Sequence, residues 1–223
     1  MTTANKITLT RICIIPFFLY FASQPMLVPD TAAAAQTMQA TFVFPTATVA
    51  ALVLFCVASF TDFLDGYVAR KYNQVTDFGK FVDPLADKLL VSSALILLVE
   101  QGAMAGWAVC LILARELIIT SLRVVAANKG RVLAATWTGK VKTCVQIGGV
   151  ILIYLYYIAF PSIGFNGPTW LLPPQVMAGA PVSGGCLPLT VIGWVMTLVT
   201  LYSGFDYLKK NWDIIKDGAV KQK

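Results

Sequence analysis

The chain is 223 residues long, 57% of them hydrophobic and only 13% charged, with a formal net charge of +6 at pH 7. This composition is too apolar for a soluble domain of this size and predicts an all-α, polytopic membrane protein. Histidine is absent, which excludes Ser-His and Cys-His catalysis and leaves carboxylates as the candidate bases and metal ligands. The basic residues border apolar stretches, so we expect membrane lipids and phosphate-bearing substrates as partners, and no nucleic acid.

The expected architecture follows from apolar stretches long enough to cross about 30 Å of hydrocarbon. They lie at approximately 7–27, 38–60, 83–101, 104–127, 137–160 and 187–208. We therefore expect six transmembrane helices in a single domain, 1–223, because no polar or Pro/Gly-rich linker divides them.

The basic residues also indicate an orientation in the membrane. The connections near 28–37, 101–104 and 161–186 contain no Lys or Arg, whereas both termini and the alternate connections do. Because Lys and Arg are retained on the cytoplasmic side, we expect both termini and the active site to face the cytoplasm. We expect the membrane itself to be a bacterial inner membrane. The Gly- and Pro-rich segment 161–186 is then an outer-side loop, whose role the sequence does not indicate.

The first expected helix opens with a polar segment, Asn5-Lys-Ile-Thr8-Leu-Thr-Arg11. Because this segment lies at the cytoplasmic end of the first expected helix, Asn5 and Thr8 are candidate contacts for substrate phosphates. The alternative is a helix cap at one of them, with Arg11 as an anchor at the membrane interface. The sequence favours neither interpretation.

Four acidic residues stand out where the second expected helix ends and the third begins: Asp62, Asp65, Asp83 and Asp87. A carboxylate at mid-bilayer costs roughly 2.5–3.5 kcal/mol, so this group needs compensating charge. At about 100° per residue, each pair lies on one helix face, and two helices could close on one cation cluster. Carboxylate oxygens suit Mg²⁺ or Mn²⁺, which makes the four acids candidate metal ligands.

Small and basic residues are interleaved with these acids: Gly66, Ala69, Arg70 and Gly79. The small residues would let a ligand approach the backbone, although membrane helices also pack through such residues. Arg70 is a candidate partner for a carboxylate or a diphosphate. Because proline is best tolerated in the first turn of a helix, Pro84 predicts that the third helix begins just before Asp83, with Gly79 in the preceding turn.

A second unusual group is basic and lies further along the chain. Its candidate phosphate ligands are Arg115, Arg123, Lys140 and Lys142. Arg115 lies deep in an expected span, where it must pair internally or face a wet cavity. Glu116 is adjacent in sequence but points about 100° away, so it could equally serve another helix. The two lysines cannot share one helix face, so at least one of them is a candidate membrane anchor.

The acidic segment has the pattern Asp62-x2-Asp65-Gly66-x2-Ala69-Arg70-x8-Gly79-x3-Asp83-x3-Asp87. It resembles the signature of the CDP-alcohol phosphotransferases, integral membrane enzymes that build phospholipid headgroups. Within that family, this segment and those around 5–18 and 114–143 look most like the phosphatidylglycerophosphate synthases. The resemblance implies the family's fold, a homodimer and bound Mg²⁺ or Mn²⁺, with two ions as in two-metal phosphoryl-transfer sites.

The same resemblance implies roles for the candidate residues. The metal ligands would be Asp62, Asp65, Asp83 and Asp87, and Asp87 would also deprotonate the attacking alcohol. The nucleotide contacts would be Gly66, Ala69, Arg70, Gly79, Asn5 and Thr8, and the acceptor-phosphate contacts Arg115, Arg123, Lys140 and Lys142. The implied reaction transfers the phosphatidyl group from CDP-diacylglycerol to glycerol 3-phosphate, releasing CMP and forming phosphatidylglycerophosphate.

The sequence leaves three other functions open. A different acceptor, such as inositol phosphate, serine or phosphatidylglycerol, would keep the family and change the product. A cation transporter would use the acids as an ion path, but they cluster near one membrane face and no discontinuous or repeated helix pair is visible. An aspartate-rich prenyltransferase also binds a diphosphate through magnesium, but the interleaved Gly66, Ala69-Arg70 and Gly79 favour cytidine diphosphate.

Overall fold

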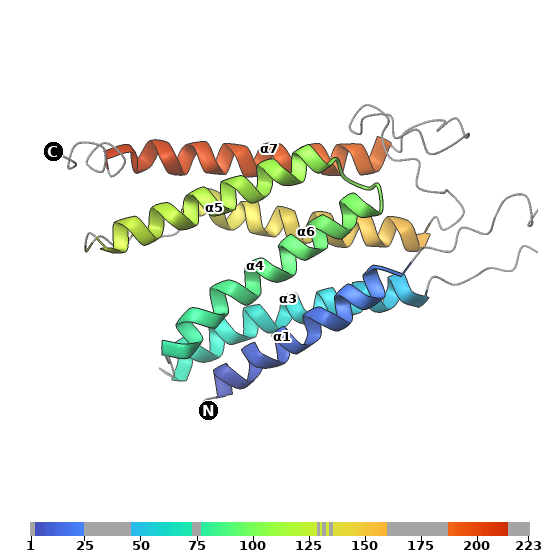
Figure 1. Cartoon of the computed structure of the whole chain (residues 1–223), viewed down its shortest axis with the longest axis horizontal. Coiled ribbons are helices and arrows are strands. Elements are labelled where there is room, and N and C mark those ends of the chain that lie inside the picture. Colours follow the sequence, from blue (N-terminus) through green and yellow to red (C-terminus); the bar gives the residue numbers. More distant parts are fainter. Residues whose placement is uncertain are drawn as a thin grey trace, which may run out of the picture. The chain divides into compact units, whose positions relative to one another are not determined.

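The computed structural model describes residues 3–24, 46–72, 77–128, 130, 133, 136–159 and 187–213. Within these ranges, the side chains of 3–8, 63–72, 77–84, 87, 128 and 187 lie outside the description. All regular secondary structure in the described ranges is helical (Figure 1).

Six helices occupy the described ranges and follow the six apolar stretches in order. They are α1 (Thr3–Ala22), α3 (Thr46–Tyr72), α4 (Asp77–Glu100), α5 (Gly106–Asn128), α6 (Trp137–Ala159) and α7 (Leu187–Lys210). The expected start of the third helix was wrong, because α4 begins at Asp77 and not just before Asp83. A carboxylate at a helix N-terminus is favourable, so Asp77 can open the helix, and Gly79 lies in the first turn of α4.

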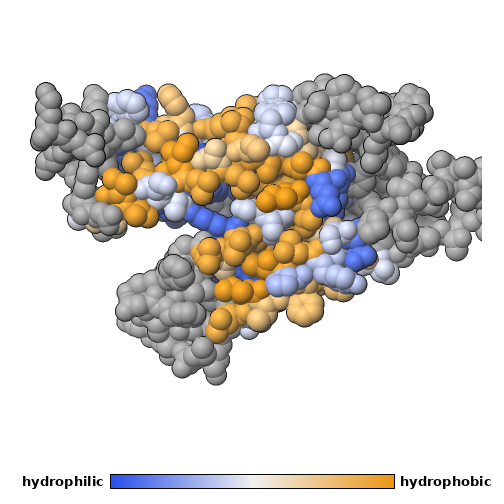
Figure 2. Space-filling view, viewed as in Figure 1, coloured by the Kyte–Doolittle hydropathy of each residue, from blue (hydrophilic) through white to orange (hydrophobic). Residues whose placement is uncertain are grey.

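Two of the helices have the length and hydropathy needed to cross a membrane: Trp137–Ala159 and Pro188–Lys210. Leu9–Ala22 and Thr46–Asp62 are shorter apolar segments. Apolar residues also cover much of the described surface on the face shown in Figure 2. Large exposed apolar side chains occur on every described helix, including Phe17, Phe60, Ile96, Leu117, Leu152 and Phe205. The six transmembrane spans therefore stay a prediction.

The helices fall into two compact units, which we describe separately. One contains Met1–Gln101 and Val150–Asn166, and the other contains Gly102–Gly149 and Gly167–Lys223. In the first unit, α1 packs against α3 and α4 (Figure 1). The rings of Phe18 and Phe55 are completely buried 5.7 Å apart, and Tyr154 lies 6.4 Å from Phe18. This aromatic cluster fixes α1 beside the helix that carries Asp62.

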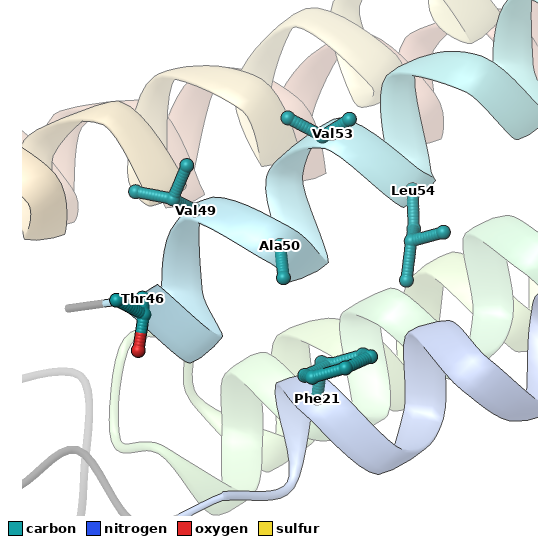
Figure 3. A pocket seen from close by; sticks show the side chains of 6 residues that line it. All are labelled: Phe21, Thr46, Val49, Ala50, Val53 and Leu54. Carbon is teal, nitrogen blue, oxygen red and sulfur yellow. The ribbon is translucent and has the colours of Figure 1, made fainter.

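An open apolar pocket of about 430 Å³ lies beside α1 and α3 (Figure 3). Phe21 of α1 faces Ala50 and Leu54 of α3 across it. Its lining is apolar except for Thr46: Phe21, Thr46, Val49, Ala50, Val53 and Leu54. Thr46 and Asp62 are about 24 Å apart along α3 at 1.5 Å per residue, so the pocket lies far from the acidic end of the helix. It suits hydrocarbon and offers no group for catalysis.

In the second unit, α5 packs against α7, and contacts of small and polar residues join α6 to both helices. Gln146 Nε2 of α6 donates to Thr200 Oγ1 of α7 at 3.0 Å, and both side chains are buried. A β-carbon placed on Gly149 would lie 2.8 Å from Met196 Cγ. The close approach of α6 to α7 at this level therefore depends on glycine.

Candidate active site

In the first unit, one candidate site joins α1 to the acidic end of α3. Arg11 Nη1 donates to Asp62 Oδ1 at 2.6 Å. The Arg11 side chain is completely buried, whereas that of Asp62 is 45% exposed. A buried guanidinium holds one oxygen of the carboxylate in place. Arg11 is therefore a partner of the acidic motif, and its interpretation as an interfacial anchor was wrong.

The other residues of the acidic and N-terminal motifs have side chains outside the described part of the structure: Asp65, Gly66, Ala69, Arg70, Gly79, Asp83, Asp87, Asn5 and Thr8. Their backbones lie within α1, α3 and α4. Among the described side chains, no group of three or more Cys, Asp or Glu residues could hold a metal ion. That search includes only Asp62 of the four aspartates, so the predicted metal centre stays a prediction.

A separate candidate site is a buried ionic cluster in the other unit, formed by Arg115, Glu116, Lys142 and Ser203. We call it the Arg115 cluster. Glu116 Oε1 accepts hydrogen bonds from Arg115 Nη1 at 3.0 Å and from Lys142 Nζ at 2.6 Å. Arg115 Nη2 donates to Ser203 Oγ at 2.8 Å. The cluster thus joins α5, α6 and α7 through one arginine and one carboxylate.

The charges of the Arg115 cluster suit an anion. The side chains of Arg115 and Lys142 are only 10% and 8% exposed, and that of Glu116 is 20% exposed. Two cations and one carboxylate leave these residues with one net positive charge. A planar guanidinium beside a compact ammonium is an arrangement that binds phosphate. The sequence left open whether Glu116 pairs with Arg115 or with a residue of another helix. In the structure it pairs with Arg115 and with Lys142 of α6.

Helix α7 approaches Arg115 most closely at Gly204. A β-carbon placed on Gly204 would lie 2.8 Å from Arg115 Cγ and 3.4 Å from its Nε. The arginine side chain can therefore lie over this position only because the residue is glycine. Arg115 Nε is itself buried, with no hydrogen-bond partner among the described residues.

The other two predicted phosphate ligands lie in different surroundings. Arg123 Nε donates to Tyr207 OH at 3.2 Å, and its guanidinium carbon lies 5.4 Å from the centroid of that ring. Lys140 is exposed, whereas Lys142 is buried. This difference confirms that the two lysines do not share a face of α6. Of the four candidates, the structure brings Arg115 and Lys142 together around Glu116.

The start of α6, which carries Lys142, is tied to α7 by Asp206. Thr138 Oγ1 and Lys210 Nζ donate to Asp206 Oδ2 at 2.8 and 2.9 Å. Thr136 Oγ1 accepts a hydrogen bond from the Gly139 amide at 3.3 Å and so caps the helix. These bonds hold the first turn of α6 beside α7.

Sequence reasoning missed the contribution of α7, which consists of Ser203, Gly204 and Asp206. A carboxylate and a Ser-Gly pair inside an otherwise apolar helix were available signals. They identified no partner, because contacts between helices do not follow from the pattern within one helix.

Similarity to known proteins places the chain in a family. The family model described as CDP-alcohol phosphatidyltransferase matches residues 1–200. The chain is 41% identical over 212 residues to the CDP-diacylglycerol–glycerol-3-phosphate 3-phosphatidyltransferase of Bacillus subtilis (strain 168), covering 95% of this chain and 96% of that protein.

Two further relatives are similar over shorter lengths. The Escherichia coli (strain K12) protein with the same name is 39% identical over 147 residues, covering 63% of this chain and 70% of the relative. A probable phosphatidylglycerophosphate synthase of Mycobacterium tuberculosis (strain ATCC 25618 / H37Rv) is 37% identical over 177 residues, covering 79% of this chain and 71% of the relative. The chain therefore belongs to the CDP-alcohol phosphatidyltransferase family, as the resemblance of its acidic motif to the family's signature implied.

Proposed function

We propose that this protein transfers the phosphatidyl group from CDP-diacylglycerol to glycerol 3-phosphate, releasing CMP and forming phosphatidylglycerophosphate. The observation that carries the proposal is the 41% identity, over 95% of the chain, to a relative named for this reaction. The buried cations of the Arg115 cluster support it, because an acceptor with a phosphate group needs such a site.

We infer that Asp62, Asp65, Asp83 and Asp87 hold two divalent cations, Mg²⁺ or Mn²⁺. Asp62 and Asp65 are one turn apart in α3, Asp83 and Asp87 are one turn apart in α4, and these two helices pack together. The half-exposed Asp62 carboxylate, anchored by Arg11, fits such a site. When bound, the ions would neutralise the diphosphate and polarise the phosphorus under attack.

The remaining motif residues would bind the nucleotide and activate the acceptor. The proposed nucleotide contacts are Gly66, Ala69, Arg70, Gly79, Asn5 and Thr8. Asp87 would accept the proton of the terminal hydroxyl of glycerol 3-phosphate. That oxygen then forms a bond to the phosphorus of the phosphatidyl group, and the bond from this phosphorus to the departing CMP breaks.

Arg115 and Lys142 would hold the phosphate of the acceptor. Both side chains are buried, and both donate to the same oxygen of Glu116, so the two cations are close to each other and fixed. Arg123 and Lys140 would be outer contacts, since both residues are exposed. Fixed cations lower the barrier by positioning the acceptor and by stabilising charge without rearrangement.

We further propose a single membrane domain of six transmembrane helices, with both termini and the active site in the cytoplasm of a bacterial cell and with a homodimeric assembly. Two helices of membrane-spanning length and the exposed apolar side chains on every described helix support the membrane location. The absence of Lys and Arg from alternate connections supports the orientation.

A transfer assay tests the proposal directly. Purified protein in detergent micelles is given CDP-diacylglycerol and labelled glycerol 3-phosphate, and both CMP and labelled lipid are measured. We expect equal amounts of the two products, loss of both after chelation, and recovery on adding Mg²⁺. Wild-type activity in the Asp83→Ala/Asp87→Ala double variant would contradict the proposed centre. Preference for labelled inositol phosphate, serine or phosphatidylglycerol would replace the acceptor and keep the reaction class.

A further inference from the structure

We infer that α7 sets the orientation of the acceptor-binding arginine, with Ser203 and Gly204 as positioning residues that act through Arg115. The inference rests on the proposed function and deepens it, because it concerns how the acceptor phosphate is held. Neither residue belongs to the acidic motif or to the candidate ligands that the sequence indicates.

The first observation concerns the two ends of the guanidinium. Glu116, on the same helix as Arg115, accepts from Nη1 at 3.0 Å, and Ser203 of α7 accepts from Nη2 at 2.8 Å. Ser203 is 1% exposed, so solvent does not compete strongly for its hydroxyl. Because a guanidinium is planar, fixing both terminal nitrogens fixes the plane of the group and the directions of its remaining N–H donors.

The second observation concerns the donor that these contacts leave over. Arg115 Nε is buried and has no hydrogen-bond partner among the described residues. Buried donors in proteins nearly always have a partner, so a buried donor without one at a candidate site indicates a missing ligand atom or water. A phosphate oxygen is the partner that a guanidinium binds best. The contacts to Glu116 and Ser203 would thus present Nε to the acceptor.

The third observation is steric. The β-carbon of an alanine at position 204 would lie 2.8 Å from Arg115 Cγ. Cγ is close to the backbone end of the side chain, so the guanidinium must move with it. Gly204 therefore provides the space in which Arg115 lies, and Ser203 beside it provides the hydrogen bond.

Two other glycines offer matched controls for the same substitution. Gly193 is also in α7, and a β-carbon there would meet nothing within 4 Å. Gly149 is in α6, and a β-carbon there would meet Met196 of α7 and not Arg115. Alanine at Gly193 tests the substitution alone, and alanine at Gly149 tests a disturbed helix contact without displacement of the arginine.

The experiment compares Ser203→Ala and Gly204→Ala with Gly193→Ala and Gly149→Ala in the full-length protein. It measures kcat and KM for each substrate, the Kd of glycerol 3-phosphate by calorimetry, and Tm. Ser203→Ala and Gly204→Ala should raise KM and Kd for glycerol 3-phosphate about tenfold, the effect of one lost hydrogen bond to a charged group. The KM for CDP-diacylglycerol should stay within about twofold, since the proposed function assigns Arg115 to the acceptor phosphate and not to the nucleotide-lipid.

The controls should separate positioning from packing. Gly193→Ala should match the wild type, and Gly149→Ala should lower Tm without a selective rise in the acceptor KM. If Gly204→Ala does not fold, Ser203→Ala decides, because it removes one oxygen and adds no bulk. Two results would overturn this inference and leave the proposed function standing. One is a wild-type KM and Kd in Ser203→Ala, and the other is a rise in the acceptor KM of Gly149→Ala as large as that of Gly204→Ala. A wild-type protein that neither binds glycerol 3-phosphate nor forms labelled lipid would overturn the proposed function and this inference together.

Discussion

Glu116 is a carboxylate that two buried cations share, and its replacement gives the clearest prediction for one residue. Glu116→Ala leaves Arg115 and Lys142 without the anion that they share. Breaking a buried ion pair costs about 3–5 kcal/mol, so we expect a loss of about 3 kcal/mol in the free energy of unfolding, measured with denaturant in micelles.

An exposed ion pair provides the control for Glu116. Lys210→Ala removes a partner of Asp206 that is itself 58% exposed, and such pairs contribute about 0–1 kcal/mol. Glycerol 3-phosphate should restore part of the stability of Glu116→Ala, because its phosphate can replace the missing carboxylate. Equal stability of the two variants would show that the buried cations do not depend on Glu116.

A second prediction at this scale concerns Asp62, which has two proposed roles. Asp62→Asn should abolish transfer but keep an oxygen that can accept from Arg11, whereas Asp62→Ala removes that oxygen as well. We expect Asp62→Ala to be less stable than Asp62→Asn by about 1–3 kcal/mol, less than for a fully buried pair because the Asp62 side chain is 45% exposed.

Thermal unfolding in the presence of a chelator measures the difference between the Asp62 variants without a contribution from bound metal. Identical Tm values for Asp62→Ala, Asp62→Asn and the wild type would mean that the contact with Arg11 contributes nothing to stability. Lower activity without lower stability would then assign Asp62 to the metal centre alone.

At the scale of helices, the contact between α6 and α7 depends on Gly149. Alanine normally stabilises a helix by about 0.5–1 kcal/mol relative to glycine. Gly149→Ala should instead destabilise the protein by about 1–3 kcal/mol, because its β-carbon would collide with Met196. Met196→Ala in the same chain should recover part of the loss, which a double-mutant cycle measures. Additive losses would contradict the contact.

The sequence predicted the helices well where apolar content alone defines them. The ends of α5, α6 and α7 lie within a turn of the expected spans. The expected start of α4 was wrong because a helix that opens on an acidic residue can begin well before Pro84, as α4 does at Asp77. The sequence also predicted that Arg115 pairs internally or faces a wet cavity, and the structure shows its pairing with Glu116. It did not indicate Ser203 or Gly204, because their role depends on how two helices approach each other.

At the scale of the whole molecule, the charge distribution predicts the orientation in the membrane. A green fluorescent protein fused after Lys223 should fluoresce, and alkaline phosphatase inserted within 161–186 should be active, because the first folds in the cytoplasm and the second outside it. The reciprocal fusions provide the control. An active phosphatase at the C-terminus would contradict the orientation inferred from Lys and Arg.

The buried Nε of Arg115 has a consequence for the choice of alcohol. An acceptor that brings no anion would leave this buried donor without a partner, whereas a phosphate oxygen would satisfy it. Sites built around a buried polar group reject analogues that lack its counterpart far more strongly than apolar pockets reject a missing methylene. Free glycerol would then bind less tightly than glycerol 3-phosphate, because it leaves the donor unpaired. Discrimination among alcohols in this enzyme would thus begin at an arginine held by a serine and a glycine of a neighbouring helix.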